Sequence, residues 1–354
     1  MEHPPAVGVA PGMRAIVYGQ AGDTSVLNLV ERDAGVPGDG EVRVRVVVSG
    51  VNPTDWKSRS GATGPMPGFA EIVPNQDGAG VIDAVGPGVD GLDVGDRVWI
   101  MLAAHGRPTG TAQEHTVIPA DRVVRLPDKV SFDLGASLGV PAVTAHRALT
   151  VSDGGPARLS PGALAGRTVL VAGGAGAVGH AAIQLARWSG ATVITTVSGP
   201  EKAALVSAAG AHHVVNYTEG DPVAAIRAVA PGGVDTIVEV APAVNAELDL
   251  AVIANHGTIA VYANNGGDRV EFDVRGFFAL NVRYQGLLLY TVGAAALQAA
   301  AEDITAALRD DALPVGERAG LPLVRFPLDR TAEAHAAVED GFVGKVLIDV
   351  TPAE

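Results

Sequence analysis

The chain has 354 residues, of which 47% are hydrophobic and 18% charged, and it contains no cysteine. Its length exceeds what one hydrophobic core usually supports, so we expect two domains. The lack of cysteine excludes disulfides, thiolate zinc sites and a cysteine nucleophile. A formal net charge of -14 disfavours a nucleic-acid partner, because the two polyanions would repel each other.

The start of the chain does not predict a targeting signal. Residues 1–12 have neither a basic region nor a sustained apolar core, so a signal peptide is not expected. The most apolar helical stretch, residues 287–301, is shorter than the roughly 20 residues of a membrane span, and Gly293 interrupts it. By elimination we expect a soluble, cytoplasmic protein that does not enter a membrane.

Up to about residue 130 the hydrophobic pattern is typical of β-strands. Valines at every second position from Val42 to Val48 alternate with Arg43 and Arg45, which predicts a half-buried strand over residues 41–48. Turns rich in Gly, Pro and Asp separate the other apolar runs. We predict further strands at residues 14–18, 79–85, 97–101 and 114–118.

From residue 167 strands alternate with helices, which is typical of a parallel sheet with helices on both faces. The predicted strands are residues 167–172, 192–197, 213–215, 234–240 and 258–262, and the helices are 177–188, 201–209, 222–229 and 245–253. The last elements do not obviously extend this sheet, and we expect them to return to the first domain. They are helices at 293–309 and 331–339 and strands at 323–328 and 345–350.

A glycine-rich turn joins the first strand and helix of the alternating region. Its G-x-G-x-x-G spacing is a weak signal alone, but here it directly follows a buried strand and opens a helix. Such glycines let the backbone approach a pyrophosphate, and the helix N-terminus offers N–H groups and a positive dipole end. We predict a dinucleotide site rather than a turn selected for packing alone. Its residues are Gly174, Ala175, Gly176, Ala177, Val178 and Gly179.

The end of the next strand favours NADPH over NADH. An NAD site needs an acidic residue there to bind the ribose hydroxyls, but this strand ends at Ser198. Lys202 follows four residues later, within reach of a 2′-phosphate, whereas Glu201 lies on the helix. The alternative is that Lys202 is an ordinary solvated helix residue.

Several stretches resemble one known family. They include GVNPTDWKSRSG at 50–61, AGVIDAVGPGVDGLDVGDRVW at 79–99 and EAHAAVEDGFVGKVLI at 333–348. With the glycine turn, they make the chain similar to the zinc-independent medium-chain dehydrogenases/reductases, in the quinone oxidoreductase and zeta-crystallin branch. The resemblance implies an α/β protein with a GroES-like β-rich domain over residues 1–140, completed by 291–354. It also implies a Rossmann doubly wound parallel sheet over 141–290 that binds NADPH.

The resemblance places two residues near the nicotinamide. Asn52 would lie beside the nicotinamide ribose and the substrate, and Thr144 would pack or hydrogen-bond near the nicotinamide. Metal-dependent relatives carry a cysteine at the position of Asn52 and a histidine–glutamate pair near Gln76 and Asp77. Both features are missing here, so no metal is expected. The family also implies a homodimer through residues 282–290.

The resemblance assigns the remaining cofactor contacts to five residues. Ser198, Lys202 and Tyr217 would surround the 2′-phosphate of the adenosine. Tyr262 would lie along the cofactor, and Lys345 near its phosphate end or the rim of the cleft.

Lys57 departs from the family pattern, because quinone oxidoreductases of this branch commonly have a tyrosine at this position. The segment NPTDWK at residues 52–57 instead resembles that of enoyl reductases of polyketide synthases and of some alkenal reductases. Without a metal, the charge that develops on the substrate oxygen needs a hydrogen bond or a cation, which makes Lys57 and Asn52 the candidate catalytic residues. The alternative is that the Lys57 stem covers Trp56 and that water supplies the proton.

Three hypotheses for the function follow. The first is an NADPH-dependent quinone reductase, and the second is a reductase of enones, alkenals or enoyl thioesters, which Lys57 favours. The third is a non-catalytic NADPH-binding protein with a structural or regulatory role. All three imply a small-molecule ligand and no nucleic acid.

Overall fold

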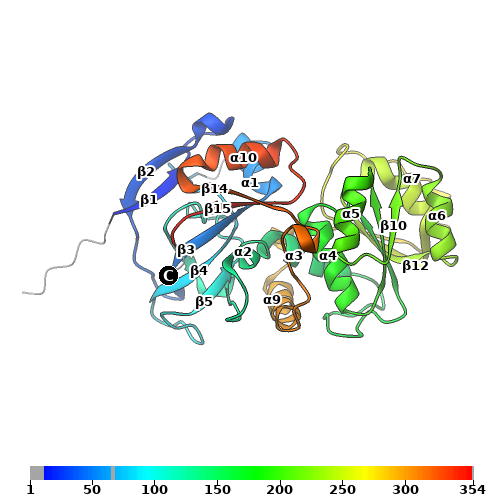
Figure 1. The fold of residues 1–354 in the computed structure, drawn as a ribbon, viewed down its shortest axis with the longest axis horizontal. Coiled ribbons are helices and arrows are strands. Elements are labelled where there is room, and N and C mark those ends of the chain that lie inside the picture. The colour runs from blue at the N-terminus through cyan, green and yellow to red at the C-terminus, as the bar shows by residue number, and fades with distance from the viewer. Residues whose placement is uncertain (1–11, 65–67, 353–354) are drawn as a thin grey trace, which may run out of the picture. The chain divides into compact units, whose positions relative to one another are not determined.

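A computed structural model describes residues 12–64 and 68–352 of the chain (Figure 1). Two compact units emerge from it. The first comprises the chain up to Ala136, Arg325–Phe342 and the chain from Val346. The second comprises Ser137–Val324 and Val343–Lys345.

The first unit is built on antiparallel strands, as the alternating valines predict. Its central strand β3 pairs antiparallel with β4, β6 and β15, so the end of the chain returns to the first domain as expected. A separate hairpin joins β1 to β2. The strands are β1 (Gly12–Val17), β2 (Asn28–Asp33), β3 (Glu41–Val51), β4 (Asp77–Val85), β5 (Arg97–Ile100), β6 (His115–Pro119), β7 (Val123–Arg125), β14 (Leu323–Pro327) and β15 (Lys345–Asp349).

Among the described residues, three α-helices accompany these strands, and hydrophobic periodicity does not predict the one nearest the candidate site. That helix, α1 (Pro53–Ser60), is short and polar, with Asn52 as its N-cap and Pro53 in its first turn. An N-cap residue followed by proline is a recognised helix start, and it was the available signal. The other two helices are α2 (Phe132–Gly135) and α10 (Thr331–Glu339).

The second unit confirms the predicted alternation of strands and helices. Its six strands are all parallel, in the order β10-β9-β8-β11-β12-β13, so the switch in strand order lies between β8 and β11. Ligands of such sheets bind beyond the carboxyl ends of the strands at this switch. The strands are β8 (Thr168–Ala172), β9 (Thr192–Val197), β10 (His213–Asn216), β11 (Val234–Glu239), β12 (Ile253–Val261) and β13 (Arg283–Gly286).

Helices cover both faces of this sheet (Figure 1). Figure 1 shows α4 and α5 on one face and α6 and α7 on the other. The buried aliphatic side chains of the strands fill the layers between, including Leu170, Ile194 and Ile237. The helices are α3 (Gly139–Leu149), α4 (Ala177–Trp188), α5 (Pro200–Ala208), α6 (Pro222–Val229), α7 (Pro242–Val252), α8 (Val274–Ala279) and α9 (Ala294–Arg309).

One predicted boundary needs correction. We expected residues 291–354 to complete the first domain, but residues up to Val324, α9 included, lie in the second unit. The reason is a buried hydrogen-bonded contact within that unit, since Asp303 of α9 lies 2.7 Å from His146 of α3. The chain returns to the first unit only at Arg325, and Val343–Lys345 again fall in the second.

Candidate functional site

Residues 173–179, the turn after β8 and the first residues of α4, are referred to below as the glycine loop. Gly173 has a φ of +66°, a left-handed conformation that favours glycine, and Gly176 is the N-cap of α4. No side chain caps this helix end. The first N–H groups of α4 therefore point to the outside of the loop with the positive end of the helix dipole.

The glycines of the loop serve two different purposes. A Cβ on Gly179 would lie 2.6 Å from the Gly173 carbonyl oxygen, and one on Gly174 would lie 2.1 Å from Thr195 Oγ1. Those two glycines are required by packing of the loop against α4 and against the neighbouring strand β9. A Cβ on Gly176 would meet nothing closer than 3.6 Å. The fold therefore leaves room at Gly176, on the side where a pyrophosphate would approach.

Ser198, Lys202 and Tyr217 meet at one corner of the second unit. Lys202 Nζ donates to Ser198 Oγ at 3.0 Å, across one turn at the start of α5. The Tyr217 amide donates to the carbonyl of Val197 at 3.0 Å, because β10 pairs in parallel with β9 and ends beside it. The Tyr217 ring is half exposed. The corner thus combines a cation, a hydroxyl and an accessible aromatic ring.

Thr144 lies on α3, and a buried cluster fixes this helix. His146 Nε2 lies 2.7 Å from Asp303 Oδ2, and Arg158 Nε and the Leu159 amide donate to the same carboxylate at 2.8 and 2.7 Å. Burial by itself would raise the pKa of Asp303, but these hydrogen bonds lower it to about 2. The cluster holds α3, and with it Thr144, through a carboxylate that stays ionised.

A pair of buried acids, not anticipated from the sequence, lies at the carboxyl end of β11. Glu239 accepts hydrogen bonds from the Ala241 amide and from Asn245 Nδ2, the latter at 3.0 Å. Burial, the charge of Glu239 and a hydrogen bond between the two acids raise the pKa of Asp249 on α7. Burial also raises the pKa of Glu239, so both acids bind a proton more readily than they would in water. Tyr262 follows β12 beside it, and burial and then the charge of Glu239 raise the pKa of its phenol.

In the first unit Asn52 is fixed by two acids. Its Nδ2 donates to Asp77 Oδ2 at 2.7 Å, and its backbone amide donates to Asp55 Oδ2 at the same distance. Asp55 also accepts from the Gln76 amide at 3.0 Å. All four residues are buried. Sequence reasoning gave no role to Asp55 or Asp77, although both lie at the predicted site.

Two of the predicted lysines have contrasting environments. Lys57 is half-buried on α1, and its Nζ lies 5.9 Å from the centre of the Trp56 ring. Lys345 opens β15, and only 1% of its surface is exposed. The roles of both lysines remain predictions.

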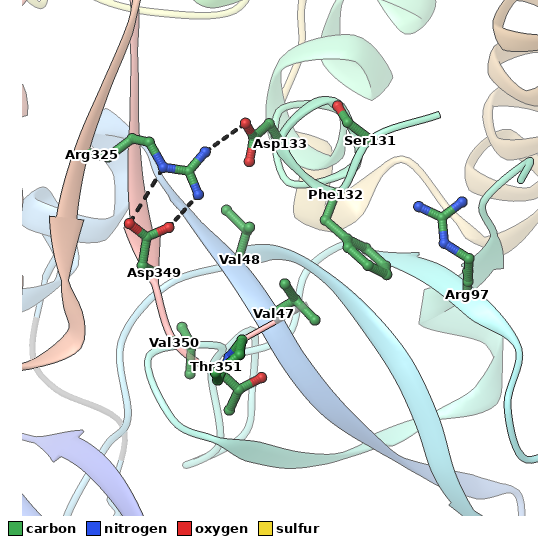
Figure 2. Close-up of a pocket in the computed structure, with 11 residues that line it drawn as sticks. Val47, Val48, Arg97, Ser131, Phe132, Asp133, Arg325, Asp349, Val350 and Thr351 are labelled. Atoms are coloured by element: carbon green, nitrogen blue, oxygen red, sulfur yellow. Dashed lines mark hydrogen bonds and ion pairs between the residues drawn. The ribbon is translucent and has the colours of Figure 1, made fainter. Parts of the chain in front are cut away.

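A pocket of about 700 Å³ lies elsewhere in the first unit, and Asn52 and Lys57 do not line it (Figure 2). Figure 2 shows Arg325 between Asp133 and Asp349, beside the apolar side chains of β3. The hydrogen bonds from Arg325 to Asp349 and then to Asp133 raise the pKa of the guanidinium, so it stays charged. These contacts join β14, β15 and α2.

Neither metal clusters nor membrane spans are found in the part of the chain that the structure describes. Within residues 12–64 and 68–352, no three His, Cys, Asp or Glu side chains are grouped so that they could hold a metal ion. Over the same residues, no helix combines the length and the apolar character needed to cross a bilayer.

Two family models match the chain, one in each unit. Residues 38–128 match the alcohol dehydrogenase GroES-like domain, and residues 177–306 match the zinc-binding dehydrogenase model. The predicted GroES-like domain and the Rossmann-like domain are therefore confirmed.

Known proteins resemble the chain over most of its length. Human quinone oxidoreductase is 32% identical over 340 residues, which are 95% of this chain and 97% of the relative. The 2-haloacrylate reductase of a Burkholderia species is 31% identical over 259 residues, 72% of this chain and 74% of that protein. A mycobacterial protein solved in complex with NADPH is 30% identical, with a TM-score of 0.78 over 95% of this chain and 99% of its own.

Proposed function

The chain belongs to the quinone oxidoreductase and zeta-crystallin branch of the zinc-independent medium-chain dehydrogenases/reductases, and from this premise we propose that it uses NADPH to reduce a quinone or an α,β-unsaturated carbonyl compound. The observation that carries the proposal is the corner of Ser198, Lys202 and Tyr217, next to a glycine loop with an open face. A cation and a hydroxyl suit a 2′-phosphate, which NADH lacks.

The residues of the second unit fit the dinucleotide. The open side of Gly176 and the uncapped N-terminus of α4 suit a pyrophosphate, which would accept hydrogen bonds from the backbone amides there. Tyr217 offers a ring face for the adenine end. Thr144 and Tyr262 would contact the rest of the cofactor, and Lys345 its phosphate end. When bound, NADPH supplies the hydride.

In the first unit the polar groups of the acceptor would meet Asn52 and Lys57. Reduction places negative charge on the carbonyl or quinone oxygen, and an ammonium group stabilises that charge or returns a proton to it. Lys57 can do either. Asn52 is buried and doubly fixed, so it can orient a bound group without rearranging.

An activated alkene is the second candidate acceptor. Lys57 stands where quinone oxidoreductases of this branch commonly have tyrosine. The relative named 2-haloacrylate reductase supports this candidate, because a haloacrylate, like an enone, carries a double bond conjugated to a carbonyl group.

The first experiment is NADPH oxidation by the purified protein with 1,4-benzoquinone and with a simple enone or enoyl thioester. We expect turnover with at least one of them. Preference for the quinone would mean that Lys57 does not set the choice of acceptor, and preference for the alkene would make the protein an ene-reductase. Binding of NADPH with no oxidation above background, whatever the acceptor, would favour a structural or regulatory role instead.

Cofactor choice is tested by Lys202→Ala. NADPH affinity should fall about tenfold or more, because the charge pair with the 2′-phosphate is lost, while NADH affinity should stay nearly unchanged. Titration by cofactor fluorescence measures both. Lys129→Ala, at an exposed position, is the matched control. Equal losses for the two cofactors would contradict the assignment.

The role of Lys57 is tested by Lys57→Ala. Turnover should fall about 10²-fold, the usual size of a lost acid or charge-stabilising group, while NADPH affinity holds. Full activity would remove Lys57 from the mechanism and leave it as a cover for Trp56.

We also propose a homodimer through β13, which is an edge strand of the second sheet. Exposed Phe278 and Leu288 lie just before and after this strand in the sequence. Light scattering with Leu288→Glu tests it, since a charge should shift a dimer toward monomer and leave a monomer unchanged.

A further inference from the structure

A series of hydrogen bonds between buried side chains leads from α10 to the start of β4. His335 Nε2 lies 2.9 Å from Asn75 Oδ1, and Asn75 Nδ2 donates to Ser49 Oγ at 2.9 Å. Ser49 Oγ lies 2.7 Å from Thr111 Oγ1, which donates to the backbone carbonyl of Asp77 at 2.5 Å. Each of the five residues is at most 1% exposed.

The number of available protons determines which group donates in each of these hydrogen bonds. The Thr111 hydroxyl proton is used on Asp77, so Ser49 must donate to Thr111, and Ser49 then needs a donor of its own. Asn75 supplies it with Nδ2, which leaves Oδ1 to accept from His335. If the Asn75 side-chain amide were turned so that Oδ1 faced Ser49, Ser49 would have to donate its proton to Asn75. No proton would then remain for the 2.7 Å contact between Ser49 and Thr111.

Asn75 and His335, at the α10 end of the series, have unusual conformations or surroundings. Asn75 has a φ of +79°, in the left-handed region that asparagine adopts more readily than most residues other than glycine. Burial, and then the charge of Arg59, lower the pKa of His335 to about 3, so the ring is neutral with its proton on Nε2. Within the described part of the chain, Nδ1 of the same ring has no hydrogen-bond partner. Retaining a polar ring with one unpartnered nitrogen in the core points to a role beyond packing.

This series of hydrogen bonds ends on Asp77, the residue that fixes Asn52. Asp77 receives Thr111 on its backbone carbonyl and Asn52 Nδ2 on its carboxylate, the latter at 2.7 Å. Resting on the function proposed above, we infer that His335, Asn75, Ser49 and Thr111 are positioning residues that hold Asp77, and through it set the orientation of the Asn52 amide toward its ligand. None of the four needs to touch cofactor or substrate.

Two matched pairs of variants test this inference. Thr111→Val keeps the shape of the side chain but interrupts the series of hydrogen bonds, whereas Thr111→Ser keeps the hydroxyl. His335→Met removes the donor at the far end, whereas His335→Gln keeps one. We expect the Val and Met variants to lower kcat/KM about tenfold for the acceptor, with the Ser and Gln variants close to wild type. If Thr111→Val does not fold, the His335 pair decides. Equal losses in the two members of a pair would overturn the inference.

A double-mutant cycle separates positioning from structural support. In an Asn52→Ala background, Thr111→Val should have no further effect on kcat/KM, because the residue that it positions is gone. A second tenfold loss in that background would overturn the inference, since a structural defect would act with or without Asn52.

A readout without turnover keeps the inference apart from the proposed function. In protein labelled with ¹⁵N-asparagine, the side-chain amide signal of Asn52 is identified by its loss in Asn52→Ala. It should move in Thr111→Val and His335→Met and stay in place in Thr111→Ser and His335→Gln. An Asn52 signal unchanged in all four variants would refute positioning even in an active enzyme. A signal that moves as expected in an inactive protein would support positioning and reject only the proposed activity.

Discussion

The glycine loop of the second unit and the Asn52 region of the first are held in place by different means. The loop depends on its backbone, because Gly179 and Gly174 allow close packing and Gly176 leaves an open face. Asn52 depends on side chains, because Asp77 and Asp55 fix it from two sides. A site made of backbone requires the absence of side chains, whereas a site made of side chains requires particular partners. The following predictions use that difference, from the largest expected effect to the smallest.

Gly179→Ala should have the largest effect on stability. The new Cβ would lie 2.6 Å from the Gly173 carbonyl oxygen and 2.7 Å from Gly174 Cα, and neither backbone atom can move without opening the loop. We expect a loss of about 3 kcal/mol or more, or no soluble protein. Urea unfolding measures it. Wild-type stability in this variant would show that the loop yields, and the comparison would fail.

Asp303→Asn should have an intermediate effect, because the α3 cluster is a part of the second unit that depends on side chains. Losing the buried carboxylate should cost about 2 to 3 kcal/mol, with Arg158 partly exposed to water. Glu302→Gln, which removes an exposed partner of Arg158, should cost less than about 0.5 kcal/mol and is the control.

The same cluster predicts a pH dependence. The pKa of Asp303 is lowered in the folded protein to about 2 from its ordinary value of 3.8, so its stabilisation is complete above about pH 5 and is lost as the pH falls toward 2. Wild type should lose about 1 kcal/mol more than Asp303→Asn between pH 7 and pH 3. Parallel urea titrations at the two pH values measure this. Equal losses would mean that the carboxylate is not stabilised in the fold.

Gly176→Ala should have the smallest effect on stability and a selective effect on binding. The new Cβ would have no atom closer than 3.6 Å, and the φ of -78° at Gly176 suits alanine. The free energy of unfolding should therefore change by less than about 1 kcal/mol. NADPH affinity should fall about tenfold or more, because the methyl group occupies the side open to the pyrophosphate. Unchanged affinity would place the dinucleotide elsewhere.

The sequence alone predicted most of the strands and helices of the second unit, whereas the cofactor contacts that it assigned there remain predictions. Strand and helix periods differ, so the alternation from residue 167 to 262 was visible locally, and α4, α6 and β9 have the predicted bounds. Ser198 and Lys202 lie one helical turn apart, which sequence spacing also shows. Tyr217 joins them because neighbouring parallel strands end at the same edge.

Only the tertiary structure decided which buried polar groups meet. His335 and Asn75 lie 260 positions apart, and Asp303 and His146 are separated by 157. Neither pair has a local pattern, because a hydrogen bond between distant residues leaves no periodicity in the sequence. The same reason explains why α9 fell in the second unit against our prediction, and why Asp77 and Asp249 were missed. Local periodicity determines elements, whereas burial of charge and hydrogen-bond pairing depend on the folded chain.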